Sequence, residues 1–350
     1  MDSLTIGDRP LGPDHPPYLI AEIGANHNGD PQLLGEMIAA AIRSGVDAVK
    51  FQSWTVDSLI SRAEYERNTA YSDKKKHFGS LREMVEAYAM TPQLEAQALE
   101  ACAQAGVHFL SSAFSPAEVA HLEEVGVPAH KVASMDIEHP ILLDAIAETG
   151  KPIFLSTGMA TMSEIARAVE RLEQRSSGPI VLFHCVSVYP APYELLNLRN
   201  IQMLTDTFAL PVGFSDHASG VASSIAAVTL GAVAVEKHFT TDKDLEGWDH
   251  AISVDEPELA ALVSGTHLAH AARGRYQRHV SDAELEKRRS FRRRIVVRTA
   301  QPAGHVLTKA DIDFKRPGFG ISPWEFEFVL GRRLAVDVLE DHELEWSDLE

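Results

Sequence analysis

The stretch PVGFSDHASGVASSIAAVTLGAVAVEKHFTTD, residues 211–242, holds two short apolar runs that each lead into a polar segment with a histidine. The first run ends before His217 and the second before His238. The small residues between the runs follow a helical period, so the stretch predicts a strand, a helix and a second strand. This is the repeating unit of a parallel β/α fold, in which the ends of neighbouring strands lie at one edge.

The same alternation of apolar run and helical segment begins at residue 18 and continues through this stretch. Eight runs are strand candidates: 18–24, 47–52, 107–112, 130–134, 152–156, 179–185, 211–215 and 232–239. The clearest helical segments are 31–45, 81–106, 162–174 and 256–274. Eight β/α units within about 250 residues predict a (β/α)8 TIM barrel of the α/β class. No Gly-x-Gly-x-x-Gly follows the first strand, which makes a doubly wound dinucleotide-binding sheet the weaker prediction.

Changes of composition divide the chain into four parts. Turn residues between two short extended pieces predict an N-terminal β-hairpin over 1–17, ahead of the barrel at 18–275. The polar segment 276–290 is a candidate linker, and short strand-like pieces over 291–350 predict a small β-rich domain.

Composition restricts the class of protein. The chain has 350 residues, of which 45% are apolar, and a formal net charge of −18, which argues against general affinity for nucleic acid. Its two cysteines, Cys102 and Cys185, form neither a disulfide framework nor a zinc motif. The N-terminus does not have the pattern of a signal peptide, and no apolar run approaches the length of a membrane span. We therefore expect a cytoplasmic protein with no membrane partner.

His217 and His238 follow adjacent barrel strands and are expected to face one site. Neutral imidazole is a common metal ligand, and two imidazoles with substrate oxygens and water suit Mn²⁺ or Mg²⁺ better than structural zinc. The alternative is that each ring only makes hydrogen bonds within its loop.

Lys50 and Lys131 interrupt apolar strands. A buried ammonium group needs an anion, so the two lysines predict a pocket for phosphate or carboxylate. Two alternatives stay open: a Schiff-base lysine, as in barrel aldolases, or a structural ion pair with Glu22 or another buried acid. Glu22 is also a candidate acid or base. Lys237 should point to the other side of its strand and is expected to be structural.

Two further segments carry charged groups. The loop DLEGWDHAIS, 244–253, follows the eighth strand and offers Asp249, either to the barrel mouth or as a turn cap. The segment 287–298 holds seven basic residues in twelve, which indicates an anionic partner in so acidic a chain.

Several blocks, in this order and at this spacing, give the chain a close resemblance to the sialic acid synthase family over roughly residues 4–350. They are YLIAEIGANHNGD, AVKFQ, SSAFS, HKVAS, KPIFLSTGMAT, LFHCVSVYPAPYE, GFSDHASG, EKHFTTD and FKRPGFG. The resemblance implies a TIM barrel followed by an antifreeze-like (SAF) domain, in a homodimer in which the SAF domain of one subunit covers the barrel mouth of the other. It implies a transferase of the N-acetylneuraminate synthase type. Such an enzyme condenses phosphoenolpyruvate with the open-chain aldehyde of an N-acetylated amino sugar, releases phosphate and yields a nonulosonic acid.

The resemblance also implies roles for individual residues. A divalent metal, Mn²⁺ or Mg²⁺, would be held by His217 and His238. Catalysis would involve Glu22, Lys50, Lys131 and Asp249. Phosphoenolpyruvate would be bound by Lys50, Ser111, Lys131, Ser134, Ser156, Ser187 and Ser215. The sugar would contact Gln52, Asp136, Tyr189, Asp249, Phe291 and Arg316, the last from the partner subunit.

Three departures from the family pattern lie on the sugar side. The family pattern K-I-x-S-G-E is replaced by Lys131 to Asp136, with Met135 at the glycine. The loop that commonly reads G-P-D here reads Gly247 to Asp249, with Trp248 in the middle. Where a polar asparagine often follows H-C-T, Cys185-Val186-Ser187 stands instead. The type of reaction is thus better supported than the acceptor. The acceptor could be N-acetylmannosamine, a diacetylated 6-deoxyhexose of the legionaminic or pseudaminic route, or another sugar. A catalytically silent sugar-binding barrel is a further alternative, against which the histidine pair argues.

Overall fold

The computed structural model describes residues 4–73, 76–176, 178–316 and 318–350. Residues 1–3 of the predicted hairpin and Pro317, beside Arg316, lie outside the described residues. The chain separates into unit 1, Met1–Gly274, and unit 2, Arg275–Glu350. In the described part of the chain, no helix is long and apolar enough to cross a membrane.

Unit 1 is built on a closed barrel of eight parallel strands, which confirms the predicted TIM barrel. In chain order these are β3 (Tyr18–Gly24), β4 (Ala48–Ser53), β7 (His108–Ala113), β8 (His130–Val132), β9 (Ile153–Ser156), β10 (Ile180–Cys185), β11 (Val212–Asp216) and β12 (Ala234–His238). The barrel closes where β12 pairs with β3, which places His238 beside Glu22.

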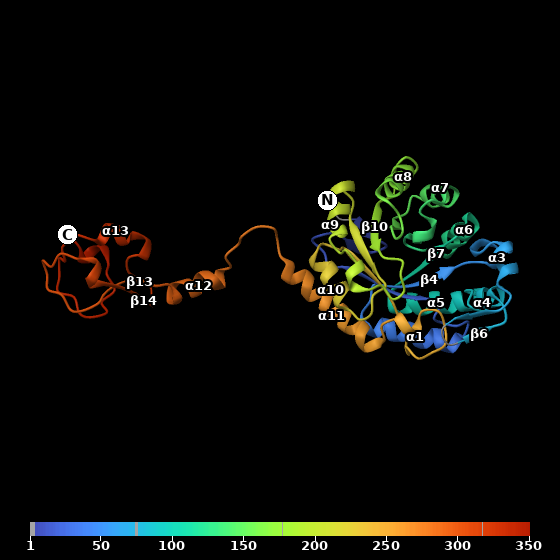
Figure 1. The fold of residues 1–350 in the computed structure, drawn as a ribbon, viewed down its shortest axis with the longest axis horizontal. Coiled ribbons are helices and arrows are strands. Elements are labelled where there is room, and N and C mark those ends of the chain that lie inside the picture. Colours follow the sequence, from blue (N-terminus) through green and yellow to red (C-terminus); the bar gives the residue numbers. More distant parts are fainter. Residues whose placement is uncertain (1–3, 74–75, 177, 317) are drawn as a thin grey trace. The chain divides into compact units, whose positions relative to one another are not determined.

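Helices surround the strands (Figure 1). They are α1 (Pro31–Ser44), α2 (Val56–Leu59), α3 (Arg62–Arg67), α4 (Leu81–Ala87), α5 (Pro92–Ala105), α6 (Pro116–Val125), α7 (Pro140–Glu148), α8 (Met162–Glu173), α9 (Asn200–Phe208), α10 (Ala222–Thr229) and α11 (Glu256–Arg273). The prediction of one continuous helix over 81–106 was wrong. Thr91 caps a new helix by accepting a hydrogen bond from the backbone of Leu94, and Pro92 lacks the N–H that a continuous helix would need.

Two apolar layers stabilise the barrel. One lies between the strands and the helices and includes Leu34, Leu122 and Phe214. The other fills the barrel interior with Leu110, Phe154, Phe183 and neighbouring side chains. Ile6 and Leu11 of the N-terminal hairpin, β1 (Leu4–Ile6) and β2 (Arg9–Leu11), belong to this interior layer, so the hairpin closes one end of the barrel. A second hairpin consists of β5 (Tyr71–Asp73) and β6 (Lys76–Phe78).

Unit 2 has a core of its own, which includes Ile295, Leu307, Leu334 and Leu344. Its elements are α12 (Asp282–Phe291), β13 (Arg294–Val297), β14 (Ile312–Lys315) and α13 (Phe326–Val329), with β13 and β14 antiparallel. The predicted linker 276–290 is thus partly helical. A capping box between Ser281 and Glu284 starts α12, and the exposed helix carries its arginines in the last turn.

Candidate active site

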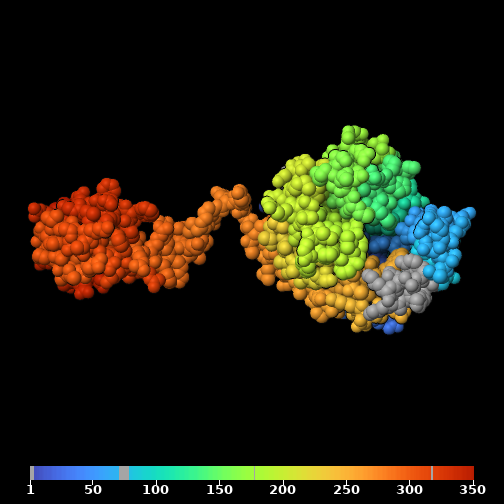
Figure 2. All heavy atoms as spheres, viewed as in Figure 1, coloured from blue at the N-terminus to red at the C-terminus, as the bar shows by residue number. Residues whose placement is uncertain are grey.

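A polar cavity of about 400 Å³ lies at the carboxyl ends of the barrel strands. Figure 2 shows unit 1 hollowed on the face turned to the viewer, with blue atoms from the N-terminal part of the chain at the floor of the hollow. The lining residues are Glu22, Lys50, Gln52, Ser112, Phe114, Lys131, Ala133, Ser134, Met135, Ser156, Met159, Cys185, Ser187, Tyr189, Ser215, His217, Glu236, His238 and Asp249. Most of the residues predicted for the site therefore line one cavity.

The alternation of side chains along a strand decides which residues face the cavity. On β7, Leu110 packs in the barrel interior, so Ser112, two residues on, points inward and lines the cavity. Lys50 Nζ lies 3.2 Å from Ser112 Oγ, whereas Ser111 Oγ lies 2.7 Å from Ser53 Oγ and does not line the cavity. The prediction of Ser111 as a site residue was therefore off by one position, and Ser112 takes its place in the cavity.

Each of the two lysines that line the cavity is paired with a buried glutamate. Lys50 Nζ lies 2.7 Å from Glu22 Oε2, and Gln52 donates to the other oxygen of Glu22 at 2.7 Å. Lys131 Nζ donates to both carboxylate oxygens of Glu236, at 2.9 and 2.8 Å. The two lysines thus carry the charge expected of an anion pocket but already have carboxylate partners.

Glu236 links the two pairs and was missed by the sequence analysis. One of its oxygens lies 3.8 Å from Lys50 Nζ, and the other accepts a hydrogen bond from Ser215 Oγ at 3.0 Å. Glu236 is two residues before His238 on β12, so the period of two was the signal that places both on the inner face. Lys237 points the other way and pairs with Asp216 at 3.1 Å, which agrees with its expected structural role.

The ion pairs determine the charge states in the cavity. Burial by itself raises the pKa of Glu236, but Lys131 and Lys50 outweigh this effect and hold the pKa at about 2. Burial tends to lower the pKa of Lys50, yet Glu22 and Glu236 raise it overall. For Lys131 burial prevails over Glu236 and lowers the pKa. Glu236 is ionised at neutral pH, and Lys50 keeps its proton firmly.

The two predicted metal-binding histidines lie close together, with ring centroids 5.5 Å apart. Burial, with a smaller contribution from His238, lowers the pKa of His217 to about 4, so the ring is neutral at pH 7. Its Nδ1 lies 2.8 Å from the carbonyl oxygen of Val186, which only accepts, so Nδ1 carries the hydrogen. The lone pair is therefore on Nε2, 3.4 Å from Ser215 Oγ, whose own hydrogen is directed to Glu236.

His238 and Asp249 form the edge of the cavity beside His217. His238 Nδ1 is buried without a hydrogen-bond partner among the described residues, and it lies 3.8 Å from Asp249 Oδ2. The ring of Tyr189 lies 4.3 Å from that of His217, and burial raises the pKa of its hydroxyl. Within the described residues, no cluster of three or more His, Cys, Asp or Glu side chains has the arrangement of a metal site. The histidine pair could thus hold an ion only with oxygen ligands from substrate or water.

Two serines contribute further polar groups to the lining. Ser187 Oγ is buried with no partner among the described residues, so it is available to a ligand. Ser134 Oγ accepts a hydrogen bond from the backbone N–H of Gly158 at 3.2 Å and lies 3.1 Å from Cys185 Sγ.

Asp136 does not line the cavity, which corrects its predicted contact with the sugar. It closes the 3-10 turn Ser134–Asp136, and burial raises its pKa to about 6. Met135, in the same turn, lines the cavity instead and is 56% exposed. With Phe114 and Met159 it gives this part of the lining an apolar character.

Phe291 and Arg316, the other residues predicted for the sugar, belong to unit 2. The Arg316 guanidinium lies 5.3 Å from the centre of the Phe291 ring, and Lys287 Nζ lies 5.4 Å from the same ring. Both predicted residues are thus part of one exposed cationic and aromatic cluster within unit 2.

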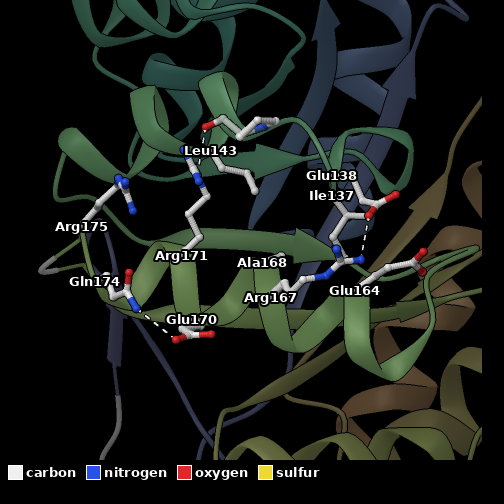
Figure 3. A pocket seen from close by; sticks show the side chains of 11 residues that line it. Ile137, Glu138, Leu143, Glu164, Arg167, Ala168, Glu170, Arg171, Gln174 and Arg175 are labelled. Carbon is white, nitrogen blue, oxygen red and sulfur yellow. Dashed lines mark hydrogen bonds and ion pairs between the residues drawn. The ribbon is translucent and has the colours of Figure 1, made fainter.

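A second cavity of about 460 Å³ lies between α7 and α8 and does not have the chemistry of an active site (Figure 3). Three arginines line it, but Arg167 is directed at Glu138, and Arg171 and Arg175 both pair with Asp144. Its three arginines are thus already paired with carboxylates, and this cavity is a surface groove held by ion pairs.

Comparison with known proteins identifies the family of this barrel. The NeuB family pattern matches residues 37–278, and the SAF domain pattern matches residues 292–350. The chain belongs to the NeuB family. The two matched segments therefore correspond to the two units of the structure, the barrel in Met1–Gly274 and the SAF domain in Arg275–Glu350.

Relatives of this NeuB family member cover nearly its whole length. The chain is 36% identical to the N,N'-diacetyllegionaminic acid synthase of Legionella pneumophila, over 98% of both chains. It is 32% identical to the human N-acetylneuraminate-9-phosphate synthase, over 95% of this chain and 92% of the human one. The crystal structure of the N-acetylneuraminic acid synthetase of Leptospira borgpetersenii superposes with a TM-score of 0.72 at 32% identity, covering 82% of this chain and 95% of that one.

Proposed function

We propose that this NeuB family member condenses phosphoenolpyruvate with the open-chain aldehyde of an N-acetylated amino sugar to give a nonulosonic acid and phosphate. The observation that carries the proposal is the shared cavity, in which a free imidazole lone pair of His217 faces the same space as the ammonium groups of Lys50 and Lys131. The names of the relatives support the class of product.

The reaction balances as an aldol-like addition followed by loss of phosphate. C3 of phosphoenolpyruvate forms a bond to the aldehyde carbon, water adds at C2, and the C2–O bond to phosphate breaks to leave the 2-keto acid. The carbon nucleophile is weak, so holding the two substrates in register is much of the work. Glu22 is suited to move a proton or to orient the water, because its carboxylate is fixed by both Lys50 and Gln52.

We assign phosphoenolpyruvate to the part of the cavity that holds the lysines and serines. Lys50, Lys131 and Ser215 meet at Glu236. Ser187 Oγ, which has no partner among the residues that the structure describes, offers a further polar contact. Ser134 and Ser156 line the same space, and Ser112 takes the position predicted for Ser111. A bound phosphate or carboxylate would share the ammonium hydrogens with the glutamates, since each ammonium group has three donors.

We propose that His217 and His238 hold Mn²⁺ or Mg²⁺. The residues fit such an ion because His217 presents Nε2 as an acceptor, and His238 is buried with a ring nitrogen that has no partner in the described part of the chain. When bound, the ion would supply Lewis-acid polarisation of the aldehyde oxygen. Tyr189 covers the His217 ring, and Asp249 contributes a negative charge near His238.

For the acceptor we favour a diacetylated 6-deoxyhexose, as in the legionaminic acid route, over N-acetylmannosamine. Met135 and Met159 line the cavity, whereas the carboxylate of Asp136 does not. An apolar lining suits a methyl or acetyl group better than an additional hydroxyl, because a hydroxyl that is buried without a partner costs free energy. The similarity to a legionaminic acid synthase points the same way.

We further propose a homodimer with exchanged SAF domains, in which Arg316 and Phe291 of one subunit serve the cavity of the other. The proposal is supported by the cationic and aromatic cluster on unit 2, which matches the need to bind an N-acyl group and cover the mouth.

Phosphate release tests the function. The protein, phosphoenolpyruvate and Mn²⁺ are incubated with N-acetylmannosamine and with 2,4-diacetamido-6-deoxyhexoses, and the product is identified by mass spectrometry. We expect metal-dependent release, with the deoxy acceptor preferred. Borohydride with pyruvate provides the opposing test. A trapped lysine adduct, together with activity that survives chelation, would establish the Schiff-base aldolase instead.

A further inference from the structure

Trp248 replaces a residue of the family pattern directly before Asp249, and its ring does not line the cavity. The ring lies 5.8 Å from that of Trp54 and 5.7 Å from that of Tyr88. Trp54 also contacts Phe114, with ring centroids 6.1 Å apart. We call Trp54, Tyr88, Phe114 and Trp248 the aromatic cluster.

The aromatic cluster gives the loop 244–253 a buried surface to pack against. Trp54 and Tyr88 are 4% and 1% exposed, and the indole N–H of Trp54 donates to the carbonyl oxygen of Val85 at 3.2 Å. Aromatic pairs at these separations stabilise the fold by more than the apolar area that they bury would account for. Phe114 lines the cavity, so the cluster connects the cavity wall with the loop that carries Asp249.

The residues on either side of Trp248 and Asp249 are also held. A Cβ atom at Gly247 would come within 2.8 Å of Asn28 Oδ1, so the loop packs closely against the loop after β3. His250 is fully buried, and its Nδ1 lies 2.7 Å from Thr240 Oγ1. The carbonyl oxygen of Asp249 accepts a hydrogen bond from Ser253 Oγ at 2.7 Å. The backbone of Asp249 is thus held on its C-terminal side by polar contacts and on its N-terminal side by the packing of Gly247 and Trp248.

We propose that Trp248 is a positioning residue, which packs into the aromatic cluster and thereby holds the Asp249 carboxylate beside His238 at the edge of the cavity. On the N-terminal side of Asp249, this packing acts together with the hydrogen bond that Asn28 Nδ2 donates to the carbonyl oxygen of Glu246, at 2.7 Å. Trp248 is the residue of this segment directly beside Asp249, whose carboxylate lies 3.8 Å from His238 Nδ1. Loss of the ring frees the carboxylate to leave its place near His238, while the residues assigned to phosphoenolpyruvate stay where they are.

A double-mutant cycle tests the proposal, and its kinetic arm rests on the proposed function. We expect Trp248→Ala to lower kcat by on the order of 10²-fold, as misplacement of a reacting group does, with little change in KM for phosphoenolpyruvate. Asp249→Asn should cost a similar factor. The double variant should be no worse than Asp249→Asn alone, because Trp248 acts through Asp249. Losses that multiply would overturn the proposal.

Two variants control for general damage. Trp248→Phe keeps an aromatic ring of similar shape and should restore most of kcat. Trp346→Ala removes a tryptophan of unit 2 and should leave kcat unchanged. Thermal unfolding identifies a variant that does not fold, in which case Trp248→Leu replaces Trp248→Ala in the cycle. If Trp248→Phe were as impaired as Trp248→Ala at equal stability, the packing argument would fail.

Two measurements do not depend on turnover. Trp54 and Trp248 are close enough for exciton coupling, so Trp248→Phe and Trp54→Phe should each abolish a circular-dichroism couplet that Trp346→Ala retains.

The dissociation constant for Mn²⁺, from electron paramagnetic resonance of the free ion, should rise equally in Trp248→Ala, Asp249→Asn and the double variant. If the wild type released no phosphate with any acceptor, the proposed function would fail, while this binding cycle would still decide on Trp248. An unchanged Mn²⁺ constant in Trp248→Ala, with Asp249→Asn weakened, would overturn the positioning role.

Discussion

Glu236 accepts two hydrogen bonds from Lys131 Nζ, at 2.9 and 2.8 Å, in the floor of the candidate active site. Both side chains are nearly inaccessible, with exposed fractions of 4% for Lys131 and 6% for Glu236. A buried ion pair is sensitive to removal of one partner, because the other charge stays in a medium of low polarity. This pair therefore connects the stability of the barrel with its chemistry.

Glu236→Gln should lower the free energy of unfolding by about 3–5 kcal/mol, because Lys131 loses the carboxylate that balances its buried charge. Urea denaturation measures the change. Glu138→Gln is the matched control, because the Arg167–Glu138 pair is exposed and should contribute only about 0–1 kcal/mol. Equal effects of the two substitutions would show that the Lys131–Glu236 pair is not buried in solution.

His217→Ala and His238→Ala should each remove tight Mn²⁺ binding and lower phosphate release by roughly 10²–10³-fold, the range for loss of one electrostatic catalytic group. Chelation of the wild type should have the same effect, and added Mn²⁺ should reverse it. His121→Ala is the control, because that ring is half exposed and bound to Glu95 outside the cavity. Release that survives chelation would contradict the metal role.

Ser112→Ala should raise KM for phosphoenolpyruvate by roughly 10- to 100-fold, since a hydrogen bond to a charged group contributes about 1.5–3 kcal/mol and Ser112 contacts Lys50. The neighbouring Ser111→Ala loses only its contact with Ser53 and should leave KM unchanged. Steady-state kinetics with saturating acceptor separates the two. An effect of Ser111→Ala alone would mean that β7 has the other side facing inward.

His27 makes stability depend on pH. Burial lowers the pKa of His27 to about 4, whereas the unfolded chain has an ordinary histidine pKa. Between these two pKa values the unfolded chain binds a proton at His27 and the folded protein does not. The contribution is complete above about pH 6.5 and is lost as pH falls to about 4, by roughly 3 kcal/mol. His27→Asn should therefore show a smaller decrease in unfolding free energy than the wild type over this range. Parallel pH profiles would contradict the shifted pKa.

Mixing of two impaired variants tests the exchanged SAF domain. Arg316→Ala and His217→Ala lie in different units, so a mixed dimer with exchanged domains contains one intact cavity. At low acceptor concentration, coexpression should recover about a quarter of the wild-type rate, because half of the dimers are mixed and each has one complete site. If the rate did not exceed that of the separate variants, each cavity would be served by its own SAF domain or by none.

Much of the barrel and its site could be predicted because alternation and periodicity are local properties of the chain. The strand candidate 18–24 agrees with β3, and the others differ by a residue or two at their ends. The errors have identifiable causes. Ser111 was chosen without applying the period of two from Leu110. The helix predicted over 81–106 was extended through Pro92. The segment before residue 291 was taken as a linker because of its polar composition, and the capping box that starts α12 was overlooked.

The partners of the buried charges could not be predicted in this way. Lys131 and Glu236 are 105 residues apart, and nothing local distinguishes Glu236 from Glu22 as the partner of either lysine. The same holds for Trp248, whose contacts lie on Trp54 and Tyr88.

By itself, the sequence determined that this is a β/α barrel with its polar residues at the strand ends, because side-chain period and chain punctuation act over a few residues. Only the tertiary structure decided that Glu236 holds Lys131 and approaches Lys50, that His217 keeps a free nitrogen, and that Trp248 lies beside Trp54. The physical reason is that closure of the barrel sets the distances between side chains remote in sequence, and the strength of each interaction depends on those distances and on the burial that closure creates.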